Sequence, residues 1–374
     1  MKNNPLKQLE TLGQSVWLDY IRRDMISSGE LRRLIAEDGL RGITSNPSIF
    51  EKAIIESHDY DSDINGMIDD RKGAMEIYET ISQRDVQSAA DEFRPLYEST
   101  DGKDGYVSLE VNPHLAYDTN GTIKESRWLW SALNRPNVFI KVPATSQGLP
   151  AIKQLTSEGI NVNITLLFGL PRYRQAAEAY IAGIEARLAM GKPVKYVASV
   201  ASFFLSRIDT YVDPLLEKII AQGGNNVELA RQVLGQTAVA SAKMAYQIYK
   251  DIFNSTRFKK LIEKGTRSQR VLWASTGTKN PQYSDVKYIE ELIGPDTVNT
   301  IPVETLNAFC GHGVANARLE EDINEARLVL ERLPELGISI DTVTQQLEDE
   351  GVEKFNKPFD KIIATLAQNI AKSV

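Results

Sequence analysis

Eight short apolar runs, each followed by a longer amphipathic stretch, restrict the fold of this 374-residue chain more than any other feature. Strand and helix in alternation predict a parallel sheet, and eight such units close into an α/β (β/α)8 (TIM) barrel. An open doubly wound sheet is the alternative, but no GxGxxG follows any expected strand. The expected strands are residues 15–20, 42–47, 105–111, 138–143, 162–168, 196–202, 270–276 and 297–302.

Three segments exceed what a plain barrel needs. We expect a loop insertion with one or two short helices at about 48–66, a polar helical insertion at about 222–268, and a helical C-terminal extension at about 317–374. No linker rich in proline, glycine or serine divides the chain. Residues 1–374 are therefore expected to form a single barrel domain.

Composition argues against several classes of partner. A net charge of -7 without a basic cluster argues against nucleic acid. No run approaches the ~18 apolar residues of a membrane span, and the N-terminus lacks the apolar core of a signal peptide. The one cysteine, Cys310, excludes an internal disulfide, and no further pattern supports a nucleophilic pair with His312. We expect a cytoplasmic protein with no membrane partner.

Each expected strand carries a polar residue at or near its C-terminal end, where barrel enzymes place their catalytic groups. In strand order these residues are Asp19, Asn46, Glu110, Lys141, Asn163 with Thr165, Ser202, Ser275, and Asn299 with Thr300. Alternate side chains of a barrel strand face the interior. Lys141 shares the parity of Phe139, and Asp19 that of Trp17, so we expect both charged groups to point inward.

An inward lysine between two carboxylates suits Schiff-base chemistry with a ketone or aldehyde. The amine must be uncharged to attack, and burial favours the uncharged form. The resulting iminium accepts electrons during carbon–carbon cleavage. One carboxylate must move the hydroxyl proton and a second acid–base group, through a water, must help expel the carbinolamine hydroxyl. Asp19 and Glu110 fit these two tasks.

A metal-dependent hydrolase is the rival interpretation. The chain has His58, His114 and His312, and none of them is spaced as a ligand pair. His114 follows the third strand, where it either lines the mouth of the barrel or serves a loop. We predict no metal site, although carboxylate-bound magnesium stays open at this point.

Five segments together resemble the transaldolase family, most closely its longer bacterial subclass. They are "LDYIRRDM", "GITSNPSIF", "SLEVNPHLAYDT", "FIKVPATSQGLPAIKQLTSEGINVNITLLFG" and "SFFLSRID", within residues 10–310. The resemblance implies a class I Schiff-base enzyme of the pentose phosphate pathway that needs no cofactor. It moves a dihydroxyacetone unit from sedoheptulose 7-phosphate to glyceraldehyde 3-phosphate, giving erythrose 4-phosphate and fructose 6-phosphate.

The resemblance also implies a role for each matching residue. Lys141 would form the Schiff base, Asp19 would act at the cleaved bond, and Glu110 with Thr165 would hold the catalytic water. Phe204 would shield the iminium. The residues implied to bind the dihydroxyacetone hydroxyls or line their pocket are Asn46, Asn163 and Ser202.

The phosphate site departs from the family pattern. Arg207 would bind the sugar phosphate, and its alternative is a surface pair with Asp209 or Asp213. Shorter members carry an "ASFRN"-like segment after the seventh strand, where this chain reads "WASTGTKNPQYSD". Ser275 keeps its place, and either Lys279 or Thr278 stands where the arginine would be.

Two further functions stay open at this stage. A fructose-6-phosphate aldolase would release free dihydroxyacetone, but such relatives tend to carry glutamine and tyrosine where this chain has Glu110 and Phe204. A non-catalytic sugar-phosphate-binding barrel is disfavoured because the Asp, Glu and Lys set is complete. The expected partners are sugar phosphates, and the chain is expected to be a monomer or a homodimer.

Overall fold

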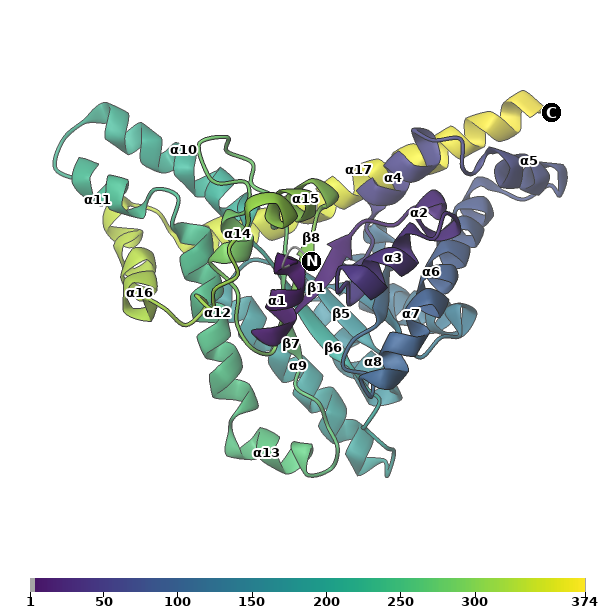
Figure 1. Ribbon diagram of the computed structural model, residues 1–374, viewed down its shortest axis with the longest axis horizontal. Helices are drawn as coiled ribbons and strands as arrows, with labels where there is room; N and C mark the ends of the chain where they lie inside the picture. The colour runs from purple at the N-terminus through teal and green to yellow at the C-terminus, as the bar shows by residue number, and fades with distance from the viewer. Residues whose placement is uncertain (1–3, 374) are drawn as a thin grey trace.

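A closed barrel of eight parallel strands forms the centre of the molecule, as the alternation predicts (Figure 1). The computed structural model describes residues 4–373. Neighbouring strands pair in sequence order, and β8 pairs with β1 to close the barrel. The strands are β1 Gln14–Asp19, β2 Gly42–Thr44, β3 Tyr106–Glu110, β4 Val138–Pro143, β5 Val162–Leu167, β6 Ser199–Phe204, β7 Arg270–Ala274 and β8 Thr297–Ile301.

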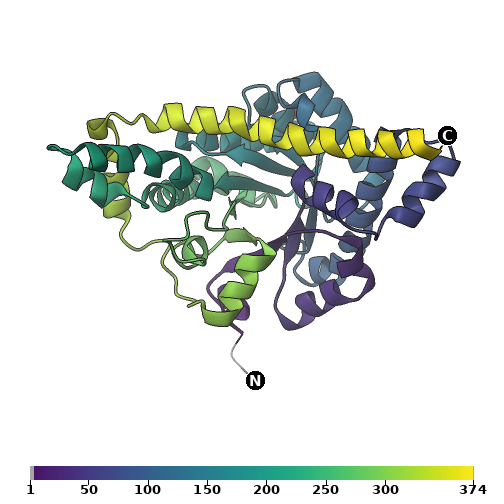
Figure 2. The same cartoon turned by 90° about the horizontal axis from the view of Figure 1, so that it is seen from above.

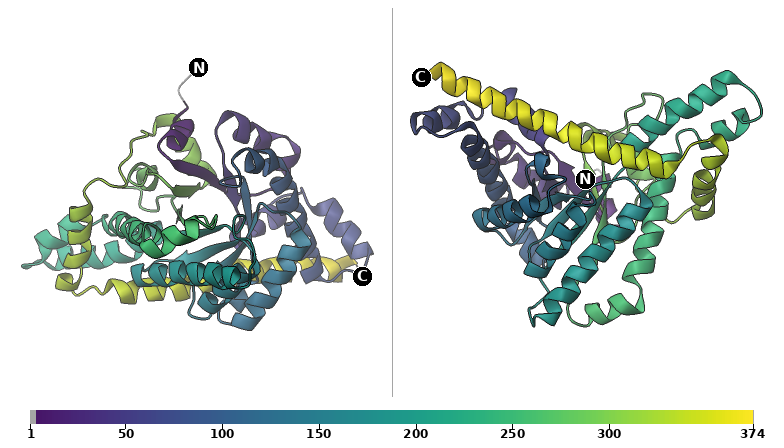
Figure 3. Two further views of the ribbon diagram at one scale, coloured as in Figure 1. Left: turned by 90° about the horizontal axis from the view of Figure 1, so that it is seen from below. Right: turned by 180° about the vertical axis from the view of Figure 1, so that it is seen from behind.

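Helices surround the barrel and extend beyond it (Figure 3). Those in the first half are α1 Pro5–Thr11, α2 Arg23–Ser27, α3 Glu30–Glu37, α4 Pro47–Ile55, α5 Asp61–Asp69, α6 Ala74–Ser99, α7 Thr119–Leu133 and α8 Gly148–Glu158, with the 3-10 turn η1 Pro113–Leu115. Those in the second half are α9 Leu170–Ala189, α10 Ser206–Gln222, α11 Val227–Val233, α12 Thr237–Phe253, α13 Thr256–Ile262, α14 Lys287–Glu290, α15 Val303–His312, α16 Ile323–Arg332 and α17 Ile340–Ser373, with η2 Pro334–Leu336.

The predicted side-chain parity holds inside the barrel. Trp17 and Phe139 are almost fully buried, and their ring centroids lie 6.0 Å apart. Tyr106 stacks on Phe139 with centroids 4.3 Å apart, which fills the interior below the strand ends. An added Cβ at Gly42 would lie 2.7 Å from the Trp17 ring, so only glycine fits beside it. This aromatic layer makes the interior a packed core that supports the residues above it.

Most strand ends lie within two residues of the prediction, but the start of the sixth strand and the end of the second each differ by three. The sixth strand runs from Ser199 to Phe204, so the prediction of 196–202 was displaced and Ser202 lies inside it. Tyr196 is 59% exposed and belongs to the preceding turn, although it continues the apolar run. The second strand ends at Thr44 because Pro47 begins α4, with Asn46 as its N-cap. Asn46 is thus a capping residue beyond the strand end.

The segment 222–268 is helical, but its predicted polar character was wrong for α12. This helix buries most of its residues and packs against α9, α10 and β7, because its alanine-rich sequence allows close approach to the barrel. The C-terminal extension contains α16 and the long α17. Figure 2 shows α17 running along one side of the barrel, from α10 to α4, and it also contacts β5. Within residues 4–373, no helix is both long and apolar enough to cross a membrane.

Candidate active site

Lys141 points from β4 into the mouth of the barrel. Its side chain is 5% exposed, and its Nζ donates to the carbonyl oxygen of Ser45 over 2.9 Å. Glu110 lies opposite Lys141 in the β3–β4 register, and its Oε2 is 3.4 Å from the Lys141 Nζ. The parallel register therefore brings the amine and one of the two predicted carboxylates into contact inside the barrel.

A cavity of about 310 Å³ opens above Lys141 at the strand ends. Nine of the eleven predicted site residues line it, and they come from different strands and loops. They are Asp19, Asn46, Lys141, Thr165, Ser202, Phe204, Arg207, Ser275 and Lys279. The other two, Glu110 and Asn163, are buried beside this lining and bond to residues that belong to it. Segments far apart in the sequence thus meet around one nitrogen atom.

Asp19 stands at the end of β1, on the cavity wall. Thr44 Oγ1 donates to Asp19 Oδ1 over 2.8 Å, and the Thr44 and Thr300 hydroxyls are 2.6 Å apart. Burial raises the pKa of Asp19, while the Lys141 cation and the Thr44 hydrogen bond act in the opposite direction. A carboxyl group with a raised pKa can both accept and return a proton near neutral pH.

Glu110 and Thr165 present unsatisfied oxygens close to Lys141. Burial raises the pKa of Glu110, and the Lys141 cation partly offsets this. The Glu110 Oε1 and the Thr165 Oγ1 are buried without a hydrogen-bond partner within residues 4–373. Leu166, directly after Thr165, has a φ of 59° at an irregularity in the β5–β6 pairing. Such buried polar atoms require a further polar partner, as a reacting group or a water would supply.

Asn163 lies beneath the cavity in a chain of side-chain hydrogen bonds. Its Nδ2 donates to Ser108 Oγ over 3.1 Å, and its Oδ1 accepts from Ser202 Oγ over 2.7 Å. Asn163 is fully buried, whereas Ser202 contributes to the cavity wall. Asn46 Oδ1 accepts the Ile49 amide of α4, and Asn46 also lines the cavity. The structure thus places Ser202 and Asn46 on the cavity surface and Asn163 one layer below.

Arg207 forms a cationic part of the wall near the start of α10. Its guanidinium lies 5.7 Å from the Phe204 ring centroid, and burial lowers its pKa. Its Nη1 is buried and unpartnered among the described residues. The alternative surface pair is not formed, because Asp209 bonds to Lys287 over 2.9 Å and Asp213 to Tyr283 over 2.8 Å. The Arg207 fork therefore remains directed at the cavity.

The loop after β7 completes the wall. Ser275 has a φ of 55°, and its hydroxyl is 2.9 Å from that of Ser206. Lys279 lines the cavity, whereas the Thr278 hydroxyl donates to the carbonyl oxygen of Ser284 over 2.8 Å within its own loop. Of the two residues considered for this position, Lys279 is the one that faces the site.

Comparison with known proteins places this site in a family. The family model described as Transaldolase/Fructose-6-phosphate aldolase matches residues 16–366. The chain belongs to this family. A relative named "Transaldolase" from Trichodesmium erythraeum is 48% identical over 100% of this chain and 99% of its own length. "Transaldolase 2" from Nostoc punctiforme is 46% identical over 99% and 98%, and "Transaldolase" from Thermobifida fusca is 44% identical over 98% and 99%.

Several residues outside the predicted site set also line this transaldolase-family cavity, among them Thr44, Lys52, Thr300 and Phe355. Thr300 was noted near the end of its strand but was given no role, and Thr44 could have been selected in the same way as a strand-end hydroxyl group. Lys52 belongs to α4 and Phe355 to α17, two helices outside the repeating strand–helix pattern. No local signal distinguishes Phe355 from the other apolar residues of α17.

The histidines and the cysteine lie apart from the family site. His114 Nε2 is 2.6 Å from Asp360 of α17, His58 pairs with Asp61, and His312 pairs with Asp285. Cys310 is exposed on α15. Among residues 4–373, no group of three or more His, Cys, Asp or Glu side chains is arranged to hold a metal ion.

Proposed function

We propose that Lys141 forms the Schiff base through which this protein carries a dihydroxyacetone unit from a ketose phosphate to an aldose phosphate. That the chain is a transaldolase-type transferase follows from family membership and from relatives with that name at 42–48% identity over nearly the full length. The assignment of the amine rests on one observation: the buried Lys141 Nζ lies in the cavity, 3.4 Å from Glu110. The donor is sedoheptulose 7-phosphate or fructose 6-phosphate.

Asp19 is proposed to act as the general base and general acid for the hydroxyl group next to the carbon–carbon bond that breaks. It removes the hydroxyl proton as the bond breaks and returns it when the acceptor aldehyde adds. Its place on the cavity wall and its burial-raised pKa support this assignment. Asn46, Asn163 and Ser202 are proposed to orient the hydroxyl groups of the dihydroxyacetone unit.

Glu110 and Thr165 are proposed to hold the water that forms and hydrolyses the iminium. The proposal is supported by their buried, unsatisfied oxygens, Oε1 and Oγ1. Glu110 lies 3.4 Å from the amine, and Thr165 lines the same cavity as Lys141. A carboxyl group with a raised pKa can donate the proton that expels the carbinolamine hydroxyl as water. Phe204 is proposed to shield the iminium from the β6 side.

Arg207, Ser275 and Lys279 are proposed to bind the substrate phosphate. Two cations and a hydroxyl group around one cavity suit a dianion, and the guanidinium can bind two oxygens at once. Lys279 supplies a point charge where the shorter subclass has an arginine. The unpartnered Arg207 Nη1 supports this role, because a buried guanidinium nitrogen requires an acceptor.

A fructose-6-phosphate aldolase activity is the second candidate, because the matching family model carries both names. That activity protonates the bound carbanion and releases free dihydroxyacetone. Phe204 has no donor for this proton, and Glu110 stands where such relatives tend to carry glutamine. The dependence of turnover on an acceptor aldehyde separates this activity from transfer. Ligand binding without any turnover would favour a non-catalytic barrel.

Reductive trapping tests the proposed amine. The protein is incubated with fructose 6-phosphate, reduced with borohydride, digested and analysed by peptide mass spectrometry. We expect a dihydroxyacetone adduct on the peptide that contains Lys141. Lys141→Arg serves as the control because it keeps the charge without a nucleophilic amine. An unmodified Lys141 in a fully active enzyme would refute the mechanism.

Domain organisation, partners, oligomeric state and location complete the proposal. We infer a single barrel domain with its added helices, sugar phosphates as its partners, and a monomer or homodimer that needs no cofactor or metal. The proposal of a cytoplasmic enzyme rests on the single cysteine and on the pathway that the family serves. Sedimentation at several protein concentrations measures the oligomeric state.

A further inference from the structure

Phe355 of α17 covers Lys141 from above. Its ring centroid lies 5.7 Å from the Lys141 Nζ, and Phe355 is 4% exposed while it lines the cavity. Phe204 lines the same cavity from β6. The helix that carries Phe355 runs along one side of the barrel and contacts β5 (Figure 2). The amine is therefore closed off by a residue that comes from the C-terminal extension and not from the barrel.

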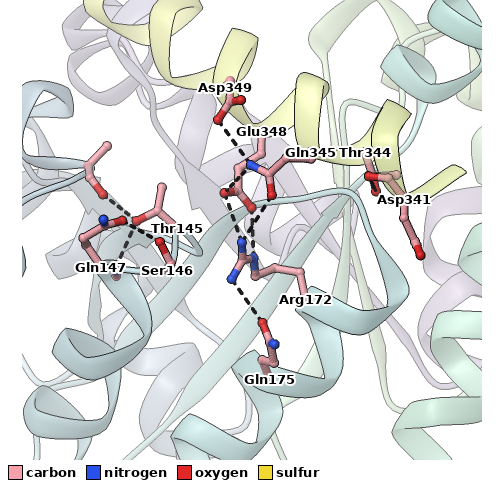
Figure 4. A network of polar contacts seen from close by, with 12 residues as sticks. Thr145, Ser146, Gln147, Arg172, Gln175, Asp341, Thr344, Gln345, Glu348 and Asp349 are labelled. Carbon is pink, nitrogen blue, oxygen red and sulfur yellow. Dashed lines mark hydrogen bonds and ion pairs between the residues drawn. The ribbon is translucent and has the colours of Figure 1, made fainter. Parts of the chain in front are cut away.

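A polar clamp fixes α17 about two turns before Phe355 (Figure 4). Arg172, in the first turn of α9, donates from Nε to Glu348 Oε2 over 3.0 Å, and its Nη2 reaches Glu348 Oε1 over 3.4 Å. Gln345 Nε2 donates to the same Oε1 over 3.2 Å. The paired side chains are 19% and 6% exposed. A two-point contact of this kind restrains both the position and the rotation of the helix.

Between the clamp and Phe355, α17 also packs closely against β5, the strand that carries Thr165. An added Cβ at Gly351 would lie 3.0 Å from Cδ2 of Leu166, the residue that follows Thr165. Glu348, Gly351 and Phe355 are spaced so that they share one face of α17. One face of α17 therefore carries the clamp residue Glu348, the close contact at Gly351 and the ring that covers Lys141. The first two contacts hold the third in position.

From this geometry we infer that Phe355 is a specificity-determining residue which keeps bulk water from the covalent intermediate and so favours transfer over release. Arg172 and Glu348 are inferred to act as positioning residues that hold Phe355 in place. The inference rests on the proposed Schiff base at Lys141.

The chemistry explains why the cover matters. After the donor is cleaved, the dihydroxyacetone unit remains on Lys141 as an enamine. In transfer, the enamine carbon bonds to the acceptor aldehyde carbon, and Asp19 supplies the proton for the new hydroxyl group. In release, the same carbon takes a proton that originates in solvent. In both cases water then adds to the iminium, the carbon–nitrogen bond breaks, and the free amine is restored. Phe355 has no proton to donate and displaces water that could donate one.

The test measures the ratio of release to transfer. Release is the rate of free dihydroxyacetone formation from fructose 6-phosphate without acceptor, and transfer is the rate of sedoheptulose 7-phosphate formation with erythrose 4-phosphate. We expect Phe355→Ala to raise this ratio about tenfold and Phe355→Leu to stay near the parent value. In deuterium oxide, the released dihydroxyacetone should carry one carbon-bound deuterium.

Phe359→Ala is the matched control. Phe359 lies one turn further along α17 with the same 4% exposure, and it packs edge-on to Tyr78. Its loss should disturb the helix without changing the ratio. An unchanged ratio in Phe355→Ala, or an equal rise in Phe359→Ala, would overturn the inference.

The clamp is tested with Glu348→Gln and Arg172→Ala, alone and combined with Phe355→Ala. We expect each single change to raise the ratio and neither to raise it further once Phe355 is absent. Additive effects would overturn the positioning role. Reductive trapping of the parent protein distinguishes failure of this inference from failure of the proposed function. An adduct on Lys141 together with an unchanged ratio would refute only the role of Phe355. The absence of any adduct would refute the proposed function.

Discussion

Two buried cation–carboxylate pairs stand at opposite ends of the same barrel, and they differ in how completely they are satisfied. At the C-terminal end of the strands, Lys141 Nζ and Glu110 Oε2 are 3.4 Å apart. At the N-terminal end, Arg270 Nη2 and Asp104 Oδ1 are 2.9 Å apart. All four side chains are at most 10% exposed. Burial and charge alone therefore do not distinguish the two pairs.

The surroundings do distinguish them. Arg270 also donates to Ser15 Oγ over 2.7 Å and to the carbonyl oxygen of Lys103 over 2.7 Å, and Ser15 donates to the second oxygen of Asp104. At the other end, Glu110 Oε1 and Thr165 Oγ1 are without partners within residues 4–373. A closed network stabilises a fold, whereas a network with free oxygens beside a cavity is arranged for a reacting group.

The largest effect is expected from Lys141→Met. Loss of the nucleophile should lower kcat by about four to six orders of magnitude. The free energy of unfolding should change little. Burial already raises the pKa of Glu110 and the Lys141 cation lowers it, so without the cation Glu110 takes up a proton and no unpaired charge stays buried. Steady-state kinetics and urea unfolding measure the two quantities, and Lys141→Arg should be equally inactive. Substantial residual turnover in both variants would show that Lys141 is not the nucleophile.

Arg270→Met should show the reverse pattern. It leaves the Asp104 carboxylate buried without its cation, which should lower the free energy of unfolding by about 3–5 kcal/mol. Turnover of the folded protein should be unchanged, because the pair lies at the far end of the barrel. Urea unfolding and kcat per folded molecule measure this, and Arg270→Met combined with Asp104→Leu should recover part of the loss. A fall in kcat without a loss of stability would contradict the structural role.

Glu110→Gln should reduce kcat by about 10²-fold. Glutamine can still hold a water but cannot exchange a proton. The expected decrease in kcat is therefore at the low end of the roughly 10²–10⁴-fold range that general acid–base groups contribute. Borohydride trapping should show slower accumulation of the Lys141 adduct. The matched change at the other end, Asp104→Asn, should leave kcat unaltered. Equal losses in the two variants would indicate that the ends of the barrel are not functionally different.

Thr44→Val should produce the smallest effect, a shift in pH dependence. Thr44 donates to Asp19, and this hydrogen bond lowers the pKa of Asp19. Without it the pKa of Asp19 rises, so the ionised form is lost at a higher pH during acidification. The acidic limb of the kcat/KM profile should move upward while the plateau is retained. An unmoved limb would show that another group governs it, and Asp19→Asn should abolish the limb.

Much of the site could be predicted because it follows strand by strand. The barrel was confirmed, and nine of the selected residues line one cavity because the C-terminal ends of parallel strands converge. The errors have local causes. The apolar run at 196–202 continues into a turn through Tyr196, which moved the sixth strand, and the alanine-rich α12 was taken for a polar insertion although it packs on the barrel.

Sequence alone determined the order of strands and helices, the inward parity of Lys141, and the presence of a complete lysine–carboxylate set, because each depends on residue types at short separations. Tertiary structure alone decided that Phe355 covers Lys141, that Ser45 offers its carbonyl oxygen to the amine, and that one buried ion pair is closed while the other is open. These contacts join residues far apart in the chain, and no local periodicity records which distant partner a side chain meets once the barrel has closed.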